Sequence, residues 1–403
     1  MRAETERKMK RWREQRWLLD QVIQTRGLDW DQGRTNKILR NCGPGAASDI
    51  REISRRVQKF TDIPREFSRA AHRREELALA AEKAGHEVEA REHCFVAATF
   101  YSNAVWAIYE DGNAKRIAWV ERKRVCYDKF IRLAGRLIER VELPFEGKSL
   151  SALLHLPSRT KADDKVPSIL YIPGMDGVKE DHPIYGDPFL ERGIAVFSMD
   201  GPGQGESRVR GVKCTASNYG EAGRAAFDYL VKRPEIDANR LAIMGSSMGS
   251  YWGPRVAAAE PRFKACAVSG VCVEPGQYTI FNTATPTFKM NYMYMSGYDD
   301  EEAFDEFAKT LTLKEAAPKI NCPYLVVAGE DDELCPIQYV YEFMGAIRAP
   351  KVLVVYEGEK HSIRNPRART LIVDWLADRL KGKPFKSEKI YVEMGGKEVH
   401  TEW

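Results

Sequence analysis

The chain has 403 residues, of which 43% are hydrophobic and 30% are charged. This is the composition of an ordinary soluble protein, long enough for one large α/β domain and a smaller one. The 62 basic and 58 acidic residues leave a net charge of only +4, which argues against nucleic acid as the main partner.

Targeting signals and cysteine usage both favour a cytoplasmic protein. Residues 1–16 carry charges of both signs and no apolar segment follows, so we expect no secretory signal. No apolar run approaches the ~18 residues that span a bilayer, so we expect no membrane partner. The eight cysteines are scattered without a C-x-x-C pair. This pattern favours free thiols in a reducing cytosol over disulfides or a metal site.

The N-terminal third, residues 1–138, is predicted to be helical. Apolar residues recur at helical spacing from Ala90 to Glu110 and again from Cys126 to Leu137. Asp111-Gly112-Asn113 separates these two helices, and earlier breaks are expected at Gly43-Pro44-Gly45 and Asp62-Ile63-Pro64. This segment has no catalytic pattern of its own.

From about residue 139, short apolar strands alternate with helices, which predicts a mostly parallel, doubly wound α/β sheet. We assign 139–385 to this domain and 386–403 to a C-terminal tail. The tail alternates around Gly395-Gly396, a hairpin signal, and would pair with a sheet edge or another subunit. Strands are expected at 139–145, 149–157, 166–172, 194–199, 240–244, 263–268, 324–328 and 352–356.

The alternation stops between residues 274 and 319, where the sequence is rich in methionine and aromatic residues. This stretch is too long for a plain connection. One interpretation is a lid-like helical insertion whose side chains form an adaptable apolar pocket wall. A locally packed helical pair would give the same sequence pattern.

The strongest chemical signal is Gly245-Ser246-Ser247-Met248-Gly249, between a predicted strand and a predicted helix. G-x-S-x-G in this context places a serine on a sharp turn at the carboxyl end of a sheet. The bare pentapeptide would be no more than a glycine- and serine-rich loop. The flanking strand and helix make Ser247 the candidate nucleophile.

A serine nucleophile needs a histidine base and an acid that orients it, in the chain order Ser, Asp or Glu, His. Asp332 follows the strand at 324–328 in a D-x-hydrophobic-x-P pattern and is our preferred acid, with Asp331 as the alternative. Only His361 and His400 follow Ser247. His361 lies between the last core strand and the last helix, where the base is expected, whereas His400 lies in the tail.

An oxyanion hole requires two main-chain N–H groups near the nucleophile. Met248, directly after Ser247, is one predicted donor. Met175 is the other, in the turn Pro173-Gly174-Met175-Asp176-Gly177 after the strand at 166–172. Proline replaces the histidine common at the start of this turn, but the donor is main chain and is unaffected.

These motifs together resemble an α/β-hydrolase group that contains 2,6-dihydropseudooxynicotine hydrolase, fungal polyketide-shortening hydrolases and fermentation-respiration switch proteins. The resemblance rests on DGPGQGES at 200–207, PGMDGVKED at 173–181, GSSMGS at 245–250 and the helix at 82–101. It implies that residues 1–138 form a cap domain over the hydrolase core and that the protein is a homodimer. It also matches Ser247, Asp332 and His361 to the family triad.

In this group, dihydropseudooxynicotine hydrolase and the fungal polyketide-shortening enzymes cleave a carbon–carbon bond beside a ketone. The resemblance therefore implies a small-molecule carbonyl substrate of 1,3-dicarbonyl or polyketide type. Such a reaction needs no cofactor and no metal, because the neighbouring carbonyl is the electron sink. The group's C–C hydrolase also uses a glutamate after the nucleophile helix, and Glu274 is the candidate counterpart, with a structural role as the alternative. The same triad would serve an esterase, lactonase, amidase or acyltransferase, and a non-catalytic binding protein could share the fold.

Overall fold

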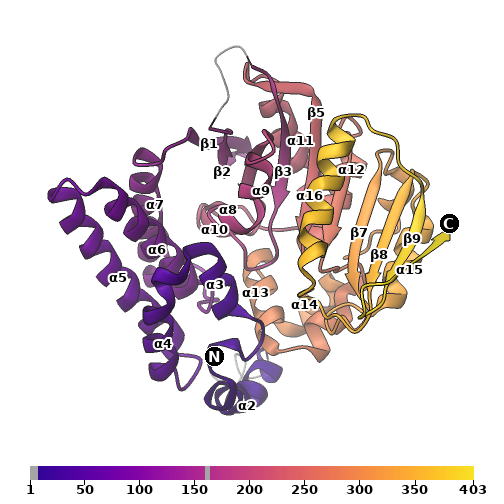
Figure 1. The fold of residues 1–403 in the computed structure, drawn as a ribbon. Coiled ribbons are helices and arrows are strands. Elements are labelled where there is room, and N and C mark those ends of the chain that lie inside the picture. Colours follow the sequence, from indigo (N-terminus) through magenta and orange to yellow (C-terminus); the bar gives the residue numbers. More distant parts are fainter. Residues whose placement is uncertain (1–7, 159–163) are drawn as a thin grey trace.

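The computed structural model describes residues 8–158 and 164–403. Residues 1–7 of the predicted N-terminal region, with the start of its charged segment, and residues 159–163 lie outside this description. A helical region and an α/β region lie side by side (Figure 1). No helix among the described residues is both long and apolar enough to cross a bilayer.

The α/β region is built on one ten-stranded sheet, in the order β1-β2-β4-β3-β5-β6-β7-β8-β9-β10. Strands β3 to β9 are joined by parallel pairings, whereas β1–β2, β2–β4 and β9–β10 are antiparallel. The predicted mostly parallel α/β sheet is therefore confirmed. The strands are β1 (Ile138–Phe145), β2 (Lys148–His155), β3 (Val166–Ile172), β4 (Ala195–Asp200), β5 (Ile236–Ser246), β6 (Cys266–Ser269), β7 (Tyr324–Gly329), β8 (Lys351–Tyr356), β9 (Glu388–Val392) and β10 (Glu398–Glu402).

Helices cover both faces of the sheet, which explains why its central strands are apolar at successive positions. Along β3, Leu170 and Ile172 pack into one hydrophobic core, and Ile169 and Tyr171 pack into another on the opposite face. The first face is covered by α11 (Tyr219–Leu230), α12 (Gly249–Ala259) and α15 (Ile337–Ala346). The second is covered by α9 (Asp187–Leu190), next to the short α8 (His182–Tyr185), and by α16 (Pro366–Leu380).

The helical region has a hydrophobic core of its own. Its elements are α2 (Lys10–Arg26), η1 (Gly27–Asp29), α3 (Arg34–Cys42), η2 (Pro44–Ala46), α4 (Ala47–Arg56), α5 (Asp62–Lys83), α6 (Glu87–Val105) and α7 (Ala114–Arg132). The breaks predicted at Gly43-Pro44-Gly45 and Asp111-Gly112-Asn113 separate helices. The break predicted at Asp62-Ile63-Pro64 is wrong by a few residues, because this tripeptide begins α5. Proline is tolerated there since the first helical turn has no intrahelical acceptor for its N–H.

Residues 274–319 form short helices that join the two regions. The elements are η3 (Pro275–Gln277), η4 (Thr279–Thr283), α13 (Pro286–Ser296), α14 (Glu301–Ala308) and η5 (Ala317–Lys319). In Figure 1 this orange segment lies below the sheet and reaches the N-terminal helices. The Glu301 carboxylate accepts the main-chain N–H groups of Arg11 (2.9 Å) and Trp12 (3.0 Å), at the start of α2. The helix N-terminus, with its unpaired N–H groups, favours such an anion.

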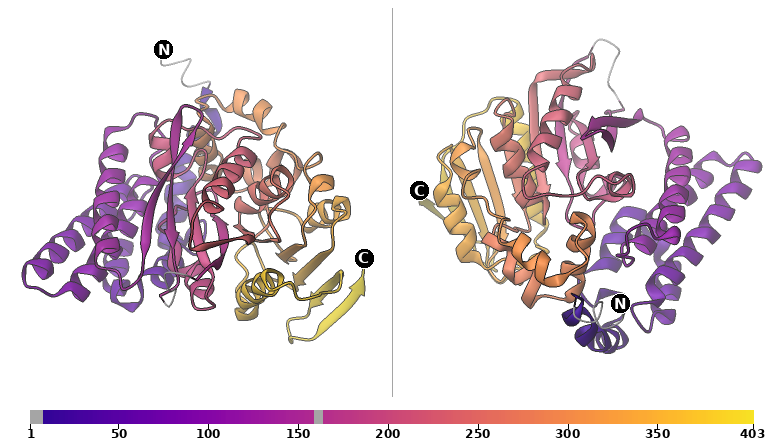
Figure 2. Two further views of the ribbon diagram at one scale, coloured as in Figure 1. Left: turned by 90° about the horizontal axis from the view of Figure 1, so that it is seen from above. Right: turned by 180° about the vertical axis from the view of Figure 1, so that it is seen from behind.

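The tail forms an antiparallel pair, β9 and β10, around Gly395-Gly396, and β9 joins β8 in parallel. The pair therefore extends the sheet at the edge farthest from the helical region (Figure 2, left). The cysteines are free, seven of them buried and Cys42 partly so. The short helix α10 (Gly205–Val209) follows β4.

Candidate active site

Ser247 occupies a sharp turn between β5 and α12 and has a left-handed φ of 53°. Such a conformation strains a non-glycine residue by about 1–3 kcal/mol and persists only where neighbours hold it. The Ser247 N–H donates to the Ser269 carbonyl (2.9 Å), and the Ser247 carbonyl accepts the Ser250 N–H (2.7 Å). A Cβ at Gly245 would lie 2.2 Å from the Gly249 carbonyl oxygen, so only glycine permits this turn.

A continuous hydrogen-bond chain links Ser247, His361 and Asp332. Ser247 Oγ lies 2.9 Å from His361 Nε2, and His361 Nδ1 lies 2.9 Å from Asp332 Oδ2. Asp332 Oδ1 also accepts the N–H groups of Leu334 (2.8 Å) and Cys335 (3.1 Å), which fixes the carboxylate at the end of β7. The structure thus brings together the three residues predicted as a triad from three distant parts of the chain.

The two alternatives weighed from the sequence lie elsewhere. Asp331 is exposed, and its N–H donates to the Glu359 carbonyl (2.9 Å). His400 lies on exposed β10, where its ring bonds the Glu388 carboxylate (2.8 Å). Among the described residues, neither Asp331 nor His400 has a hydrogen bond or ion pair to Ser247, His361 or Asp332. Asp332 and His361 therefore remain the candidate acid and base.

The electrostatics of His361 suit a general base. Burial lowers its pKa, but the charge and hydrogen bond of Asp332 outweigh burial and the net pKa lies above the usual 6.5. In the neutral ring, the Asp332 carboxylate holds the proton on Nδ1, because a carboxylate can only accept there. Nε2 is then the free acceptor, and it faces the Ser247 hydroxyl.

The loop after β3 approaches the nucleophile closely and carries the predicted oxyanion donors. A Cβ at Gly174 would lie 2.9 Å from Ser247 Cβ, so the loop passes directly beside the serine. Met175, next in the chain, and Met248 are both buried. Within residues 8–158 and 164–403, neither main-chain N–H has a hydrogen-bond acceptor. Two buried unpaired N–H groups beside a serine can stabilise an oxyanion there.

Gln204, from the DGPGQGES segment, fixes this loop. Its side-chain N–H donates to the carbonyls of Gly174 (2.7 Å) and Gly177 (3.4 Å). Its Oε1 accepts from the Tyr219 hydroxyl and from the Gly201 N–H (3.3 Å). The sequence marked this segment only as part of a family resemblance and did not reveal its support of the oxyanion loop.

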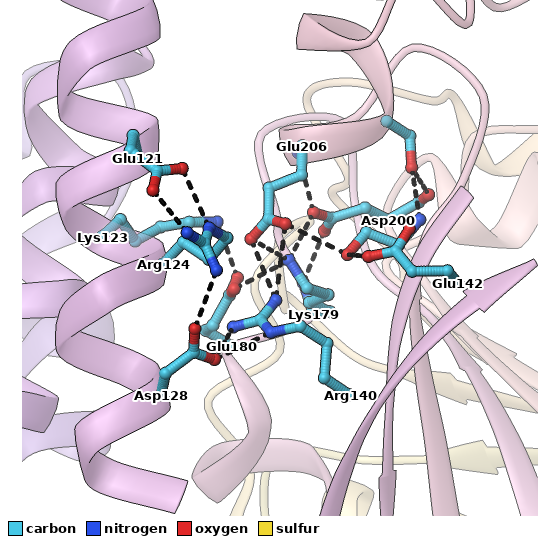
Figure 3. A network of polar contacts seen from close by, with 12 residues as sticks. Glu121, Lys123, Arg124, Asp128, Arg140, Glu142, Lys179, Glu180, Asp200 and Glu206 are labelled. Carbon is cyan, nitrogen blue, oxygen red and sulfur yellow. Dashed lines mark hydrogen bonds and ion pairs between the residues drawn. The ribbon is translucent and has the colours of Figure 1, made fainter. Parts of the chain in front are cut away.

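A buried network of charges ties the same loop to the helical region (Figure 3). Lys179 bonds Asp200 (3.0 Å), Glu206 (2.7 Å) and Glu180 (2.8 Å). Glu180 in turn pairs with Lys123 of α7 at 2.8 Å. Burial raises the pKa of Glu180 and of Glu206, but the neighbouring lysines outweigh burial and hold each pKa below its usual value. Both carboxylates therefore stay ionised although they are almost fully buried.

Glu274, the additional candidate, is buried and lies just after β6. Its Oε2 accepts the Thr279 N–H (2.8 Å) at the start of η4. No hydrogen bond or ion pair between Glu274 and the triad is present among the described residues. Nor does the described part of the chain hold a group of three or more His, Cys, Asp or Glu side chains placed to bind a metal ion.

Two cavities lie between the helical region and the loop that carries Met175. The first is lined mainly by α3 and α6, with Asp176, Val178 and Asp181 on the loop. The second reaches Met175 and Gln204 on one side, Arg116 and Lys123 of α7 on another, and Asn291 and Met295 of α13 on a third. Both predicted walls, the N-terminal helices and the 274–319 segment, therefore border the space beside the predicted oxyanion donor.

The chain is similar in sequence and in fold to known hydrolases. The prolyl oligopeptidase family model matches residues 188–382, a stretch that contains Ser247, Asp332 and His361. 2,6-Dihydropseudooxynicotine hydrolase from Paenarthrobacter nicotinovorans is 28% identical over 300 residues, covering 73% of this chain and 78% of that protein. The fungal 20-hydroxy-prefusarin hydrolase from Gibberella moniliformis is 30% identical over 225 residues, covering 54% of this chain and 52% of its own length.

The crystal structure of 2,6-dihydroxy-pseudo-oxynicotine hydrolase superposes on this chain with a TM-score of 0.74 and 25% identity. The superposition covers 87% of this chain and 97% of that one, so it includes the helical region as well as the sheet. These similarities confirm the resemblance to 2,6-dihydropseudooxynicotine hydrolase and to fungal hydrolases that the sequence motifs predict.

Proposed function

We propose that this chain, an α/β hydrolase related to 2,6-dihydropseudooxynicotine hydrolase and to fungal hydrolases, cleaves a carbon–carbon bond beside a ketone. The substrate would be a 1,3-dicarbonyl or polyketide-like molecule. The observation that carries the proposal is the hydrogen-bond chain from Ser247 Oγ through His361 to Asp332, beside the unpaired N–H groups of Met175 and Met248.

In the proposed reaction, His361 Nε2 takes the proton of Ser247 Oγ while Oγ attacks one carbonyl carbon of the substrate. The carbonyl oxygen becomes an oxyanion and accepts the N–H groups of Met175 and Met248. The tetrahedral intermediate collapses by breaking the bond between the attacked carbon, which stays on Ser247 as an acyl group, and the carbon that lies between the two carbonyl groups. The latter carbon leaves as part of an enolate, and the His361 imidazolium protonates it.

Water completes the cycle. His361, neutral again, removes a proton from a water molecule that attacks the acyl group on Ser247, and a second oxyanion forms in the same position. Its collapse returns the proton to Ser247 and releases a carboxylic acid. The products are one ketone and one acid, and the second carbonyl of the substrate is the electron sink in the step that breaks the carbon–carbon bond.

The competing function is hydrolysis of an ester, lactone or amide by the same residues. The match to a peptidase family model supports this alternative. A panel of 1,3-diketones and a panel of esters, with products identified by mass spectrometry, separates the two. Cleavage of diketones into a ketone and an acid, abolished in Ser247→Ala, supports the proposal. Fast ester turnover without any diketone cleavage would refute it, and lack of labelling of Ser247 by a fluorophosphonate would indicate a non-catalytic protein.

We propose Glu274 as an additional catalytic residue. Its hydrogen bond to the Thr279 N–H supports the alternative that Glu274 only holds the start of η4 in place. Glu274→Gln retains an oxygen acceptor for that N–H but cannot transfer a proton. An acid–base role predicts a loss of about 10²-fold in kcat. Near-normal kcat would assign the residue to fixing the start of η4.

We also infer a homodimer, from the family resemblance, and a cytoplasmic location, from the free buried thiols. Light scattering coupled to size-exclusion chromatography tests the first. Fractionation of the source cells tests the second.

A further inference from the structure

Arg116 is a buried cation without an anionic partner. It lies in the first turn of α7, and its side chain is only 8% exposed. Its Nη1 donates to the carbonyls of Val105 (2.8 Å) and Ile108, at and just beyond the end of α6. Its Nε has no acceptor, and no carboxylate forms an ion pair with it within residues 8–158 and 164–403.

The surroundings of Arg116 do not neutralise its charge. The Arg116 guanidinium lies over the ring of Tyr294, 3.9 Å from the ring centroid. The guanidinium of Arg208 lies over the same ring, 4.4 Å from the centroid. Arg208 is itself paired with Asp111 at 3.0 Å. Burial lowers the pKa of Arg116, Tyr294 raises it and Arg208 lowers it again. Arginine nevertheless stays protonated in proteins, so a net positive charge remains.

Arg116 Nη1 caps the end of α6, but this contact gives no role to Nε on the other edge of the guanidinium. A buried charge is costly unless it is paired and hydrogen-bonded. Helix carbonyls can be satisfied by an uncharged donor, so the carbonyl contacts of Nη1 do not require a cation. The unpaired Nε and the uncompensated charge indicate that an anion binds here in the working enzyme.

Arg116 lines the second cavity, the one that reaches Met175, and the other unused polar groups on its wall match it. Ser102 and Trp106 line the same cavity, and in the described part of the chain Ser102 Oγ and Trp106 Nε1 have no hydrogen-bond partner. The indole N–H can only donate, and the hydroxyl can donate. The charged neighbours are already paired, Lys123 with Glu180 (2.8 Å) and Asp176 with Arg34 (2.8 Å). Arg116 Nε, Trp106 Nε1 and Ser102 Oγ can therefore all donate to an oxyanion.

We propose that this cavity is an anion-binding subsite in which Arg116, with Ser102 and Trp106, holds a carboxylate or similar oxyanion of the substrate. Because Met175, the predicted oxyanion donor, also lines this cavity, a substrate anchored here would extend from its anion toward Ser247. This inference rests on the proposed hydrolase function and narrows its substrates to acidic ones.

The test compares substrates that differ only in charge. The diketone pair is para-acetoacetylbenzoate and para-acetoacetylbenzamide, and the ester pair is the para-nitrophenyl monoester of adipic acid and its terminal amide. A charge-assisted hydrogen bond in a buried site discriminates by about 10- to 100-fold, and we expect that preference for the acid in kcat/KM. Arg116→Gln, which keeps an N–H donor for the α6 carbonyls, should reduce the preference to about twofold or less.

Arg122→Met is the matched control, since Arg122 lies on the same helix, is 45% exposed and pairs with Glu75. It should keep the wild-type preference for the acid. Arg116→Lys retains the positive charge but lacks the planar guanidinium, so it should keep part of the preference for the acid. All three variants and the wild type are compared by thermal melting, which shows whether the fold is intact.

The inference is overturned if the wild type turns over the amide as well as the acid, a result that needs no variant. It is also overturned if Arg116→Gln keeps the full preference for the acid. Failure of the proposed function gives a different result, in which neither diketone is cleaved. The ester pair then still decides whether Arg116 recognises an anion.

Discussion

Gly174→Ala tests how closely the oxyanion loop depends on the nucleophile turn. The added Cβ would lie 2.9 Å from Ser247 Cβ and 3.4 Å from both Ser247 Oγ and the Ser246 carbonyl oxygen. Carbon atoms in contact prefer about 3.5–4.0 Å, so the loop and the serine must separate by roughly 0.6–1.1 Å. A misplacement of about 1 Å in a catalytic site can cost about 10²-fold in rate. We therefore expect kcat to fall by about that factor.

The assay is steady-state hydrolysis of a para-nitrophenyl ester together with the rate of fluorophosphonate labelling of Ser247. Both should fall, because the Met175 N–H follows Gly174 and moves with it. Gly253→Ala is the control, since a Cβ on that residue of α12 would meet no atom closer than 3.5 Å. It should leave both rates near wild type. Wild-type kcat in a stably folded Gly174→Ala protein would refute the proposed geometry, and equal losses in both variants would point to α12 instead.

Two further predictions concern charge. Since the pKa of His361 lies above 6.5 and only the neutral ring accepts the serine proton, kcat/KM should fall as the pH drops through that raised pKa. In a pH–rate series, Asp332→Asn should move this limb to lower pH and reduce kcat by about 10⁴-fold, whereas an unshifted limb would show that another group titrates. Lys123→Met leaves buried Glu180 without one of its cations and should lower the free energy of unfolding in urea by about 3 kcal/mol. Lys309→Met, at a pair with Glu306 that is 69% and 73% exposed, should change it by less than about 0.5 kcal/mol.

The elements that could be predicted from the sequence are those whose signals are local. G-x-S-x-G between a strand and a helix fixes Ser247 on its turn, because the backbone geometry requires small residues on both sides. The order of strands then brings Asp332 and His361 to the same edge, since parallel strands end together. The core strands and the helices of the N-terminal third could also be predicted, because the spacing of apolar residues along a single sequence shows which side chains are buried.

The contacts that support the site could not be predicted, because they join residues distant in sequence whose types are not distinctive. Lys123, Lys179 and Glu206 resemble solvated surface charges in the sequence, and only the packing of α7 against the loop shows that they are buried together. Gln204 is one residue of a turn until its side chain is seen to bind the Gly174 carbonyl. Arg116 is a helix residue with basic neighbours in the sequence, and its lack of a counter-ion is a three-dimensional property.

The triad alone does not choose between a diketone and an ester, so the choice must depend on how the substrate is held beyond the reacting carbonyl. One helix, α7, carries both Arg116 and Lys123, and Lys123 is joined through Glu180 and Lys179 to the loop that carries Met175. The separation between the proposed anion subsite and the predicted oxyanion donor is therefore set by a helix and a buried ion network rather than by mobile side chains. A rigid separation should select substrates by length. In a series of acidic diketones lengthened one methylene at a time, we expect kcat/KM to pass through a single maximum. A flat series would mean that the two walls of the cavity move independently.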